Sequence, residues 1–193
     1  MSALHNTDGI MLHLSPYGDS SVIAKIYTEK FGMQTYLVNG VRSSKAKNKS
    51  VFFQPLSLLQ LVVYHRPDKG LQRISSLAFA NRFVSIPFEI TKSAQSIFIA
   101  ELLYRTIREE EANHALFSFL FDAIVQLDNT ISANPDFHLL FMIRLSAFLG
   151  FGPTDNYEEQ LCFDMKEGCF STKNSSHLYV IDASTSLLLH QCL

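Results

Sequence analysis

The hydrophobic pattern of this sequence changes its period near Pro87, and that change limits the folds the chain can adopt. Before this proline, short apolar segments alternate with clusters of Gly, Pro, Asp and Ser, which is typical of strands joined by tight turns. After it, apolar residues recur every three or four positions, which indicates amphipathic helices. Strands followed by helices predict an α+β chain whose two parts meet near residues 85–87.

Five segments before the change have the alternation and the turn-bounded length of strands. Small closed barrels are built from such strands, some of them joined by long loops, and closure leaves no unpaired strand edge. We therefore predict an α+β multidomain chain that begins with a five-stranded OB-fold barrel at residues 1–84. An SH3-like barrel fits the same pattern and remains an alternative. The predicted strands are residues 9–14, 20–28, 33–38, 56–65 and 71–83.

Helical spacing predicts three helices in residues 85–152, which would form a compact antiparallel bundle. The first helix would follow an N-cap at Thr91 and extend to Glu110. Its acidic last turn opposes the helix dipole, so we expect that turn to fray. Asn113 is the expected N-cap of the second helix, and Asn134 is the expected N-cap of the third.

The residues that follow Gly150 are expected to form a small C-terminal region that packs on the bundle. A glycine at this position is typical of a helix end, so the third helix should stop there. Within residues 153–193, the sequence indicates two short strands at 161–164 and 168–171 and a final helix from residue 186.

The charge of the chain is unevenly distributed along it. The net charge is only −2, but residues 1–82 carry ten Lys and Arg against four Asp and Glu, and the remaining residues carry six against fourteen. A basic half joined to an acidic half suggests that the first half binds a polyanion and that the second has another task.

The sequence also indicates the cellular compartment of the protein. No apolar run approaches the roughly 20 residues of a membrane span. The N-terminus has neither the basic nor the apolar region of a signal peptide. Three cysteines, an odd number, argue against a secreted disulfide framework. We expect a cytoplasmic protein with no membrane partner.

The most basic stretch of the chain lies between two predicted strands, at residues 40–50. It carries Arg42, Lys45, Lys47 and Lys49 and no acidic residue, and Ser, Asn and Gly surround these charges. Such a segment cannot bury a face, so we predict a mobile cationic loop suited to a polyanion. A solvated loop that is kept polar for solubility is the alternative interpretation.

The barrel half also offers aromatic rings between its cations. Binding of single-stranded nucleic acid needs a cationic groove for phosphates and rings on which bases stack. On the strand at 20–28, Ile23, Lys25 and Tyr27 share one face, although an ordinary solvent-facing surface would look the same. Tyr17 and Tyr64 are interleaved with the cations as well. Our candidate nucleic-acid contacts are Lys25, Arg42, Lys45, Lys47, Lys49, Arg66, Lys69, Arg73, Tyr27 and Tyr36.

No motif in the sequence supports catalysis. The phosphate-binding Gly-x-x-x-x-Gly-Lys-Ser/Thr loop, the dinucleotide-binding Gly-x-Gly-x-x-Gly, the metalloprotease His-Glu-x-x-His and the nucleophile-bearing Gly-x-Ser-x-Gly are all absent. The seven histidines are scattered singly. We therefore predict a protein that is not an enzyme and that uses no cofactor.

A zinc site is the one metal centre that the sequence raises. Cys162, Cys169, His177 and Cys192 are potential ligands, but structural zinc sites draw ligand pairs from knuckles spaced by two to four residues, and these spacings are wider. Buried reduced thiols are the better interpretation, so we predict no bound metal.

Several segments, taken in order, resemble one known family. They are Gly-Ile-Met-Leu-His-Leu-Ser-Pro-Tyr-Gly-Asp-Ser-Ser-Val-Ile at 9–23, Phe-Gly at 31–32, Val-Asn-Gly-Val-Arg-Ser-Ser-Lys at 38–45, Gln-Pro-Leu-Ser-Leu-Leu at 54–59, Ala-Glu-Leu-Leu at 100–103 and Leu-Gly-Phe-Gly-Pro at 149–153. Together they resemble the DNA repair protein RecO family, in register over residues 9–170.

The resemblance implies an N-terminal OB-fold, a helical bundle and a small C-terminal region. It also implies a recombination mediator that binds single- and double-stranded DNA and anneals complementary strands. Family members act with RecR and with the C-terminal tail of single-strand DNA-binding protein to help load RecA. An RNA-binding or translation-associated OB-fold module, or a protein–protein scaffold that uses the acidic bundle, remains an alternative.

By position, Arg42 and Lys45 fall on the family's basic loop, and Lys47 and Lys49 extend it. Phe141 and Arg144 on the third helix are candidate partner contacts. Some members bind zinc through two Cys-x-x-Cys pairs, which this chain lacks, so the metal is not carried over. The family pattern also continues beyond residue 193.

Overall fold

The computed structural model describes residues 3–42, 49–172 and 177–193. The chain forms two compact units, Met1–Asn134 and Pro135–Leu193. The first unit holds a barrel and two helices, and the second holds one helix, a small sheet and a final helix. No helix in the described part of the chain is both long enough and apolar enough to cross a membrane.

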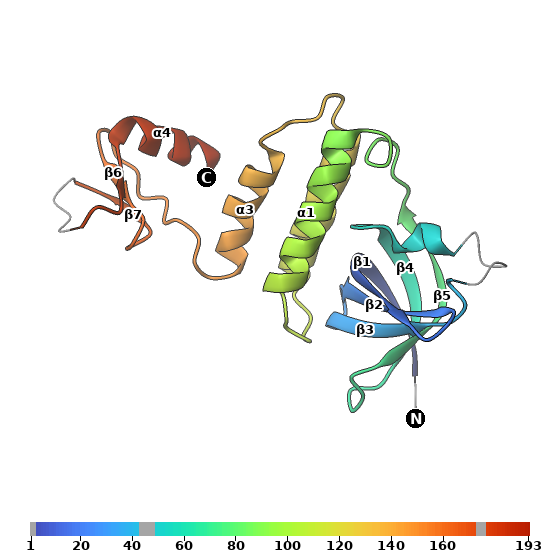
Figure 1. The fold of residues 1–193 in the computed structure, drawn as a ribbon. Coiled ribbons are helices and arrows are strands. Elements are labelled where there is room, and N and C mark those ends of the chain that lie inside the picture. Colours follow the sequence, from blue (N-terminus) through green and yellow to red (C-terminus); the bar gives the residue numbers. More distant parts are fainter. Residues whose placement is uncertain (1–2, 43–48, 173–176) are drawn as a thin grey trace. The chain divides into compact units, whose positions relative to one another are not determined.

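The predicted barrel is confirmed as a closed sheet of five strands with the order β1-β2-β3-β5-β4 (Figure 1). Neighbouring strands are antiparallel, except that β3 and β5 pair in parallel through Tyr36–Gln72 and Leu37–Arg73. The strands are β1 (Ala3–Tyr17), β2 (Ser21–Thr28), β3 (Gly32–Val38), β4 (Leu58–His65) and β5 (Gln72–Asn81).

The first strand begins earlier than its sequence pattern predicts. Residues 4–8 are mostly polar, but the backbone from Ala3 onward pairs with β4, beginning opposite His65. This pairing closes the barrel, so the length of β1 is determined by backbone hydrogen bonds to a distant strand rather than by apolar alternation.

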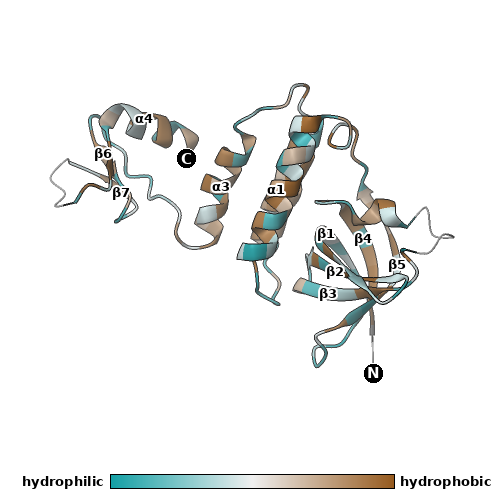
Figure 2. Ribbon diagram, in the orientation of Figure 1, coloured by the Kyte–Doolittle hydropathy of each residue, from teal (hydrophilic) through white to brown (hydrophobic). Residues whose placement is uncertain are grey.

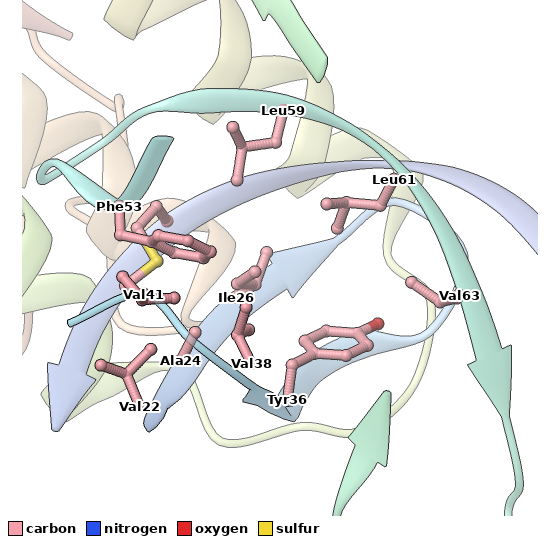
Figure 3. Close-up of a cluster of buried hydrophobic side chains, with 11 residues drawn as sticks. Val22, Ala24, Ile26, Tyr36, Val38, Val41, Phe53, Leu59, Leu61 and Val63 are labelled. Atoms are coloured by element: carbon pink, nitrogen blue, oxygen red, sulfur yellow. The ribbon is translucent and has the colours of Figure 1, made fainter. Parts of the chain in front are cut away.

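Alternate side chains of the strands point inward and fill the barrel, as Figure 3 shows. A fully buried aliphatic or aromatic side chain contributes about 1.5–3 kcal/mol relative to an exposed one, so this cluster is the main source of the barrel's stability. Phe53 reaches the cluster from a short 3₁₀ helix, η1 (Ser50–Phe53), that precedes β4. The buried set is Met11, Val22, Ala24, Ile26, Tyr36, Val38, Val41, Phe53, Leu59, Leu61 and Val63.

Two helices complete the first unit: α1 (Ile90–Thr106) and α2 (His114–Asn129). The side chain of Asn113 accepts a hydrogen bond from the Leu116 N–H at 3.0 Å, which confirms the predicted cap of α2. α1 contacts β1, and its apolar and polar positions are mixed along the helix in Figure 2. α1 stops at Thr106, before the predicted end at Glu110, as expected for an acidic turn that opposes the dipole.

The segment after α1 is held tightly against the β2–β3 turn. The Met33 N–H donates a hydrogen bond to the Glu109 carbonyl at 2.9 Å. Gly32 has a positive φ of 62°, and a Cβ atom there would lie 2.4 Å from the Glu111 carbonyl oxygen. Only glycine fits this close approach of two backbones.

The second unit contains α3 (Phe137–Phe148), a three-stranded sheet and α4 (Ala183–Cys192). α3 has its N-cap at Asp136, two residues after the predicted cap, but it ends as predicted at Gly150. There the N–H groups of Gly150 and Phe151 donate to the carbonyls of Ala147 and Ser146 at 3.2 and 3.1 Å, which is a Schellman motif. The sheet strands are β6 (Cys162–Asp164), β7 (Cys169–Ser171) and β8 (Val180–Ile181).

The final helix starts at Ala183, three residues before its predicted start, because Asp182 caps it. The Asp182 carboxylate accepts hydrogen bonds from the N–H groups of Ser184 and Thr185 at 3.0 and 3.1 Å. These bonds and those from the two hydroxyls favour the charged carboxylate and hold the pKa of Asp182 well below its usual value. The predicted packing of residues 153–193 on a three-helix bundle at 85–152 stays a prediction.

Candidate nucleic-acid interface

The outer surface of β2, β3 and β5 carries the strand cations of the first unit. β2 buries Val22, Ala24 and Ile26, so the intervening Ile23 and Lys25 face outward. Strand register then forms a row of outward positions that crosses four strands. The row is Ile23, Leu37, Arg73 and Tyr64, each the register partner of the next. OB-folds bind oligonucleotides on this face, between the β1–β2 and β4–β5 loops.

The β4–β5 hairpin adds two more cations at one end of this row. A buried Gln72 side chain fixes the hairpin: its Oε1 accepts from the Arg66 N–H at 2.9 Å, and its Nε2 donates to the Arg66 carbonyl at 2.7 Å and to the Lys69 carbonyl. A pocket of about 310 Å³ opens beside it, lined by Tyr64, Arg66, Lys69, Leu71, Gln72 and Arg73.

The composition of this pocket suits a nucleic-acid strand. Three of its lining residues are the predicted cations Arg66, Lys69 and Arg73, and none of its lining residues is acidic. Tyr64 leaves 41% of its surface exposed, so its ring is open to a base. Cations that form charge-assisted hydrogen bonds to phosphate, next to an open aromatic ring, can hold a backbone and stack a base.

Arg42 follows β3 in the sequence and is bonded to the β1–β2 turn, which is the second loop that borders this face. Its N–H donates to the Ser20 carbonyl at 2.9 Å, and its guanidinium donates to the Gly18 carbonyl at 3.4 Å. Lys49 is exposed just before η1. Lys45 and Lys47 lie outside the described residues, and so does the predicted mobility of their loop.

The prediction that Tyr27 and Tyr36 stack on bases is wrong for this structure, because both rings are buried. Tyr36 points into the barrel among the core residues of Figure 3, and this burial raises the pKa of its phenol. Tyr27 lies at the end of β2, where Phe117 of α2 approaches its ring with centroids 6.2 Å apart. Burial, together with the nearby charge of Glu109, raises the pKa of Tyr27 to about 12.

Tyr64 takes the place of those two tyrosines in the candidate interface. The alternation in β4 already carries the signal, because Leu61 and Val63 point inward and Tyr64 therefore points outward. On α3, Arg144 is exposed but Phe141 is buried, which leaves only Arg144 of the pair accessible to a partner.

The potential zinc ligands of the sequence are spread over the second unit. Cys162 on β6, Cys169 on β7 and Cys192 at the end of α4 are all free thiols. His177 Nε2 instead lies 3.3 Å from Asp164 Oδ2. In the part of the chain that the structure describes, no three His, Cys, Asp or Glu side chains are grouped to bind a metal ion. The prediction of no bound zinc stays a prediction.

Comparisons with known proteins cover both halves of the chain. Residues 1–83 match the family model "Recombination protein O N terminal", and residues 87–176 match "Recombination protein O C terminal". The DNA repair protein RecO of Bacteroides fragilis is 44% identical over 170 residues, which are 88% of this chain and 70% of the relative. The DNA repair protein RecO of Phocaeicola vulgatus is 40% identical over 175 residues, 90% of this chain and 73% of the relative. The DNA repair protein RecO of Flavobacterium psychrophilum is 36% identical over 166 residues, which are 86% of this chain and 69% of the relative. By these matches the chain belongs to the RecO family.

Proposed function

We propose that this chain acts in recombinational DNA repair by binding DNA on the outer face of β2, β3 and β5 and by annealing complementary strands. The observation that carries the proposal is the pocket at the β4–β5 hairpin, which Arg66, Lys69 and Arg73 line together with an exposed Tyr64. Membership of the RecO family supports a role in repair. Strand binding and annealing are the finer steps that we infer.

Binding of this kind is independent of sequence. The cations attract phosphate oxygens and the ring stacks on any base, so neither reads the hydrogen-bonding edge of a base. The same phosphate contacts serve single- and double-stranded DNA. A bound single strand then keeps its pairing edges free for a complementary strand.

Annealing follows from neutralisation of charge. Two complementary strands repel each other, and a protein that binds phosphates of both lowers this repulsion. The hairpin cations can hold one strand, while Arg42, which is bonded to the β1–β2 turn, can hold another. Lys45, Lys47 and Lys49 follow Arg42 in the sequence and add to its positive charge. No step forms or breaks a covalent bond, and the sequence has no nucleotide-binding loop, so ATP is not required.

The partners of the proposed reaction are the single-strand DNA-binding protein, through its C-terminal tail, and RecR, with RecA loaded as the result. Family membership supports these partners. The exposed Arg144 is our candidate for a contact with one of them.

The test measures DNA binding and strand pairing together. Anisotropy of a labelled single strand is followed against salt concentration for the wild type and for a variant with Arg66→Gln, Lys69→Gln and Arg73→Gln. Each phosphate contact on a single strand contributes about 0.7 to the slope of log affinity against log salt, so the variant should lose roughly 2. The alanine variant of Arg42, Lys45, Lys47 and Lys49 should lose up to roughly 3.

Energy transfer between two labelled complementary strands measures annealing in the same samples. Pairing should be faster with protein, without ATP, and should slow steeply with added salt. Bound DNA that pairs no faster than in buffer would remove annealing and leave a passive DNA-binding module. No binding at low salt would reject the proposal, and tighter binding of an RNA of the same sequence would favour the RNA-binding alternative.

A further inference from the structure

A second basic pocket lies in the first unit, where the barrel meets the segment after α1. Its volume is about 300 Å³. Lys25 of β2 lines it together with Tyr104 and Arg105 from the last turn of α1 and with Arg108 and Glu110 beyond the helix. The wall is preformed, because the Met33 N–H bonds to the Glu109 carbonyl at 2.9 Å and Gly32 packs closely against the same segment.

Two of the three cations in this pocket are available to a ligand. The Arg105 Nε atom donates to Glu101 Oε1 at 2.7 Å, so its charge is paired. The side chains of Lys25 and Arg108 form no ion pair and no hydrogen bond with the residues that the structure describes, although the Arg108 backbone N–H donates to Glu109 Oε2 at 3.2 Å. Two unpaired cations in one pocket attract an anion.

The Tyr104 ring in this pocket is held in a fixed orientation. It stacks on the imidazole of His13 from β1, with centroids 4.3 Å apart and planes 7° from parallel. His13 Nε2 lies 3.1 Å from Ser15 Oγ, which restrains the imidazole in turn. His13 is also the register partner of Lys25, so the ring pair and the cation are neighbours on the barrel surface.

The cations, the carboxylate and the aromatic ring of this pocket together fit a nucleotide better than they fit a simple anion. Lys25 and Arg108 match a phosphate, whereas the carboxylate of Glu110 repels one. A carboxylate does accept hydrogen bonds from the exocyclic amino groups that adenine, cytosine and guanine carry. An aromatic ring suits a base or a sugar. A nucleotide unit of a DNA strand uses all three features, and inorganic phosphate uses only one.

We propose that a DNA strand bound on the barrel face continues past Lys25 and places a nucleotide in this pocket, with its phosphate at Arg108 and its base or sugar at Tyr104. The inference rests on the proposed function, since Lys25 and Thr35 adjoin the row of Ile23, Leu37 and Arg73 on the same face. It extends the binding surface from the barrel to the end of α1.

The experiment uses a labelled single strand of about 20 nucleotides, longer than the site of many single OB-folds. The sequence contains no tryptophan, so Tyr104→Trp introduces a single indole into the pocket. DNA binding should quench its emission over the same concentrations that raise the anisotropy of the strand. Separately, Arg108→Gln should weaken binding by roughly three- to tenfold and lower the salt slope by about 0.7.

Two further variants make the result specific. Arg82→Gln removes an exposed cation of the same unit that lines neither basic pocket, and it should leave the salt slope unchanged. Arg108→Lys keeps the charge and should restore the slope. With DNA bound, either an unquenched indole or a wild-type slope in Arg108→Gln overturns the inference and leaves the barrel-face proposal intact. If the wild type binds no DNA, the proposed function itself has failed.

Discussion

The buried ammonium of Lys92 donates a hydrogen bond to the backbone carbonyl of Asp128 at 3.2 Å, across 36 residues of sequence. Lys92 also donates to Ser85 Oγ at 2.7 Å and to the Thr130 carbonyl, and it lies 3.4 Å from a Glu89 carboxylate oxygen. The Asp128 carboxylate in turn accepts hydrogen bonds from the backbone N–H groups of residues 84–86 at 2.8–2.9 Å. This cluster fastens the linker between the barrel and α1 to the end of α2.

We therefore expect Asp128→Ala to destabilise the first unit strongly. The substitution leaves the backbone N–H groups of Val84, Ser85 and Ile86 without their carboxylate acceptor, which should cost about 3 kcal/mol of unfolding free energy in urea. Asp122→Ala is the matched control, because Asp122 is an exposed carboxylate on the same helix and its loss should change stability by less than about 0.5 kcal/mol. Equal effects of the two variants would contradict the role given to the cluster.

Tyr64 is expected to contribute to DNA binding through its ring. Tyr64→Ala should weaken binding of a single strand by roughly tenfold, since stacking on one base contributes about 1–3 kcal/mol. Tyr64→Phe keeps the ring and should retain most of the affinity. Anisotropy titrations of both variants at one salt concentration provide the measurement. A loss as large in Tyr64→Phe as in Tyr64→Ala would mean that the hydroxyl, and not stacking, matters.

Tyr36 should behave in the opposite way. Its hydroxyl is buried and has no hydrogen-bond partner among the described residues. Tyr36→Phe removes this unsatisfied group, so it should raise the unfolding free energy by up to about 1 kcal/mol and leave DNA affinity unchanged. If the Tyr36→Phe protein folds but binds DNA more weakly, Tyr36 does contribute to the interface and this prediction is wrong.

Stability should fall in mild acid because of His65. Its ring stacks on Phe31 with centroids 3.9 Å apart, and burial, with a smaller effect of His5, lowers the pKa of His65 below its usual 6.5. The unfolded chain therefore binds the proton more readily. The stabilisation from the neutral ring is complete above pH 6.5 and is lost as the pH falls through the lowered pKa.

His65→Phe keeps a ring against Phe31 and removes the titration. Urea unfolding at pH 7.5 and 5.5 should show a smaller loss of stability in this variant than in the wild type. An identical loss in both proteins would assign the acid sensitivity to other groups.

The purified protein should contain no stoichiometric zinc, because the sequence lacks the paired Cys-x-x-Cys ligands that hold the metal tightly. Metal analysis of protein prepared without added zinc measures this directly, and a chelator should leave the thermal midpoint unchanged. Zinc close to one ion per chain would contradict the prediction.

Local patterns were enough to predict much of this fold. The five strands of the barrel, the Asn113 cap and the Gly150 helix end all follow from residues within a few positions of each other. Alternation, capping and positive φ are local properties, so the sequence carries them directly. The order of its motifs was also sufficient to indicate the RecO family.

The candidate interface depended on contacts that no local pattern contains. Alternation within β4 indicates that Tyr64 is open, but its place opposite Arg73 comes from strand register, and Tyr27 is covered because Phe117 of α2 approaches its ring. Nothing in the neighbouring sequence distinguishes Lys92 from a surface lysine of a helix, yet its hydrogen-bond partners lie as much as 38 residues away. The sequence by itself determined which elements form and the chemistry that they offer. Only the tertiary structure decided which side chains face one another, because that depends on pairing between residues that are distant along the chain.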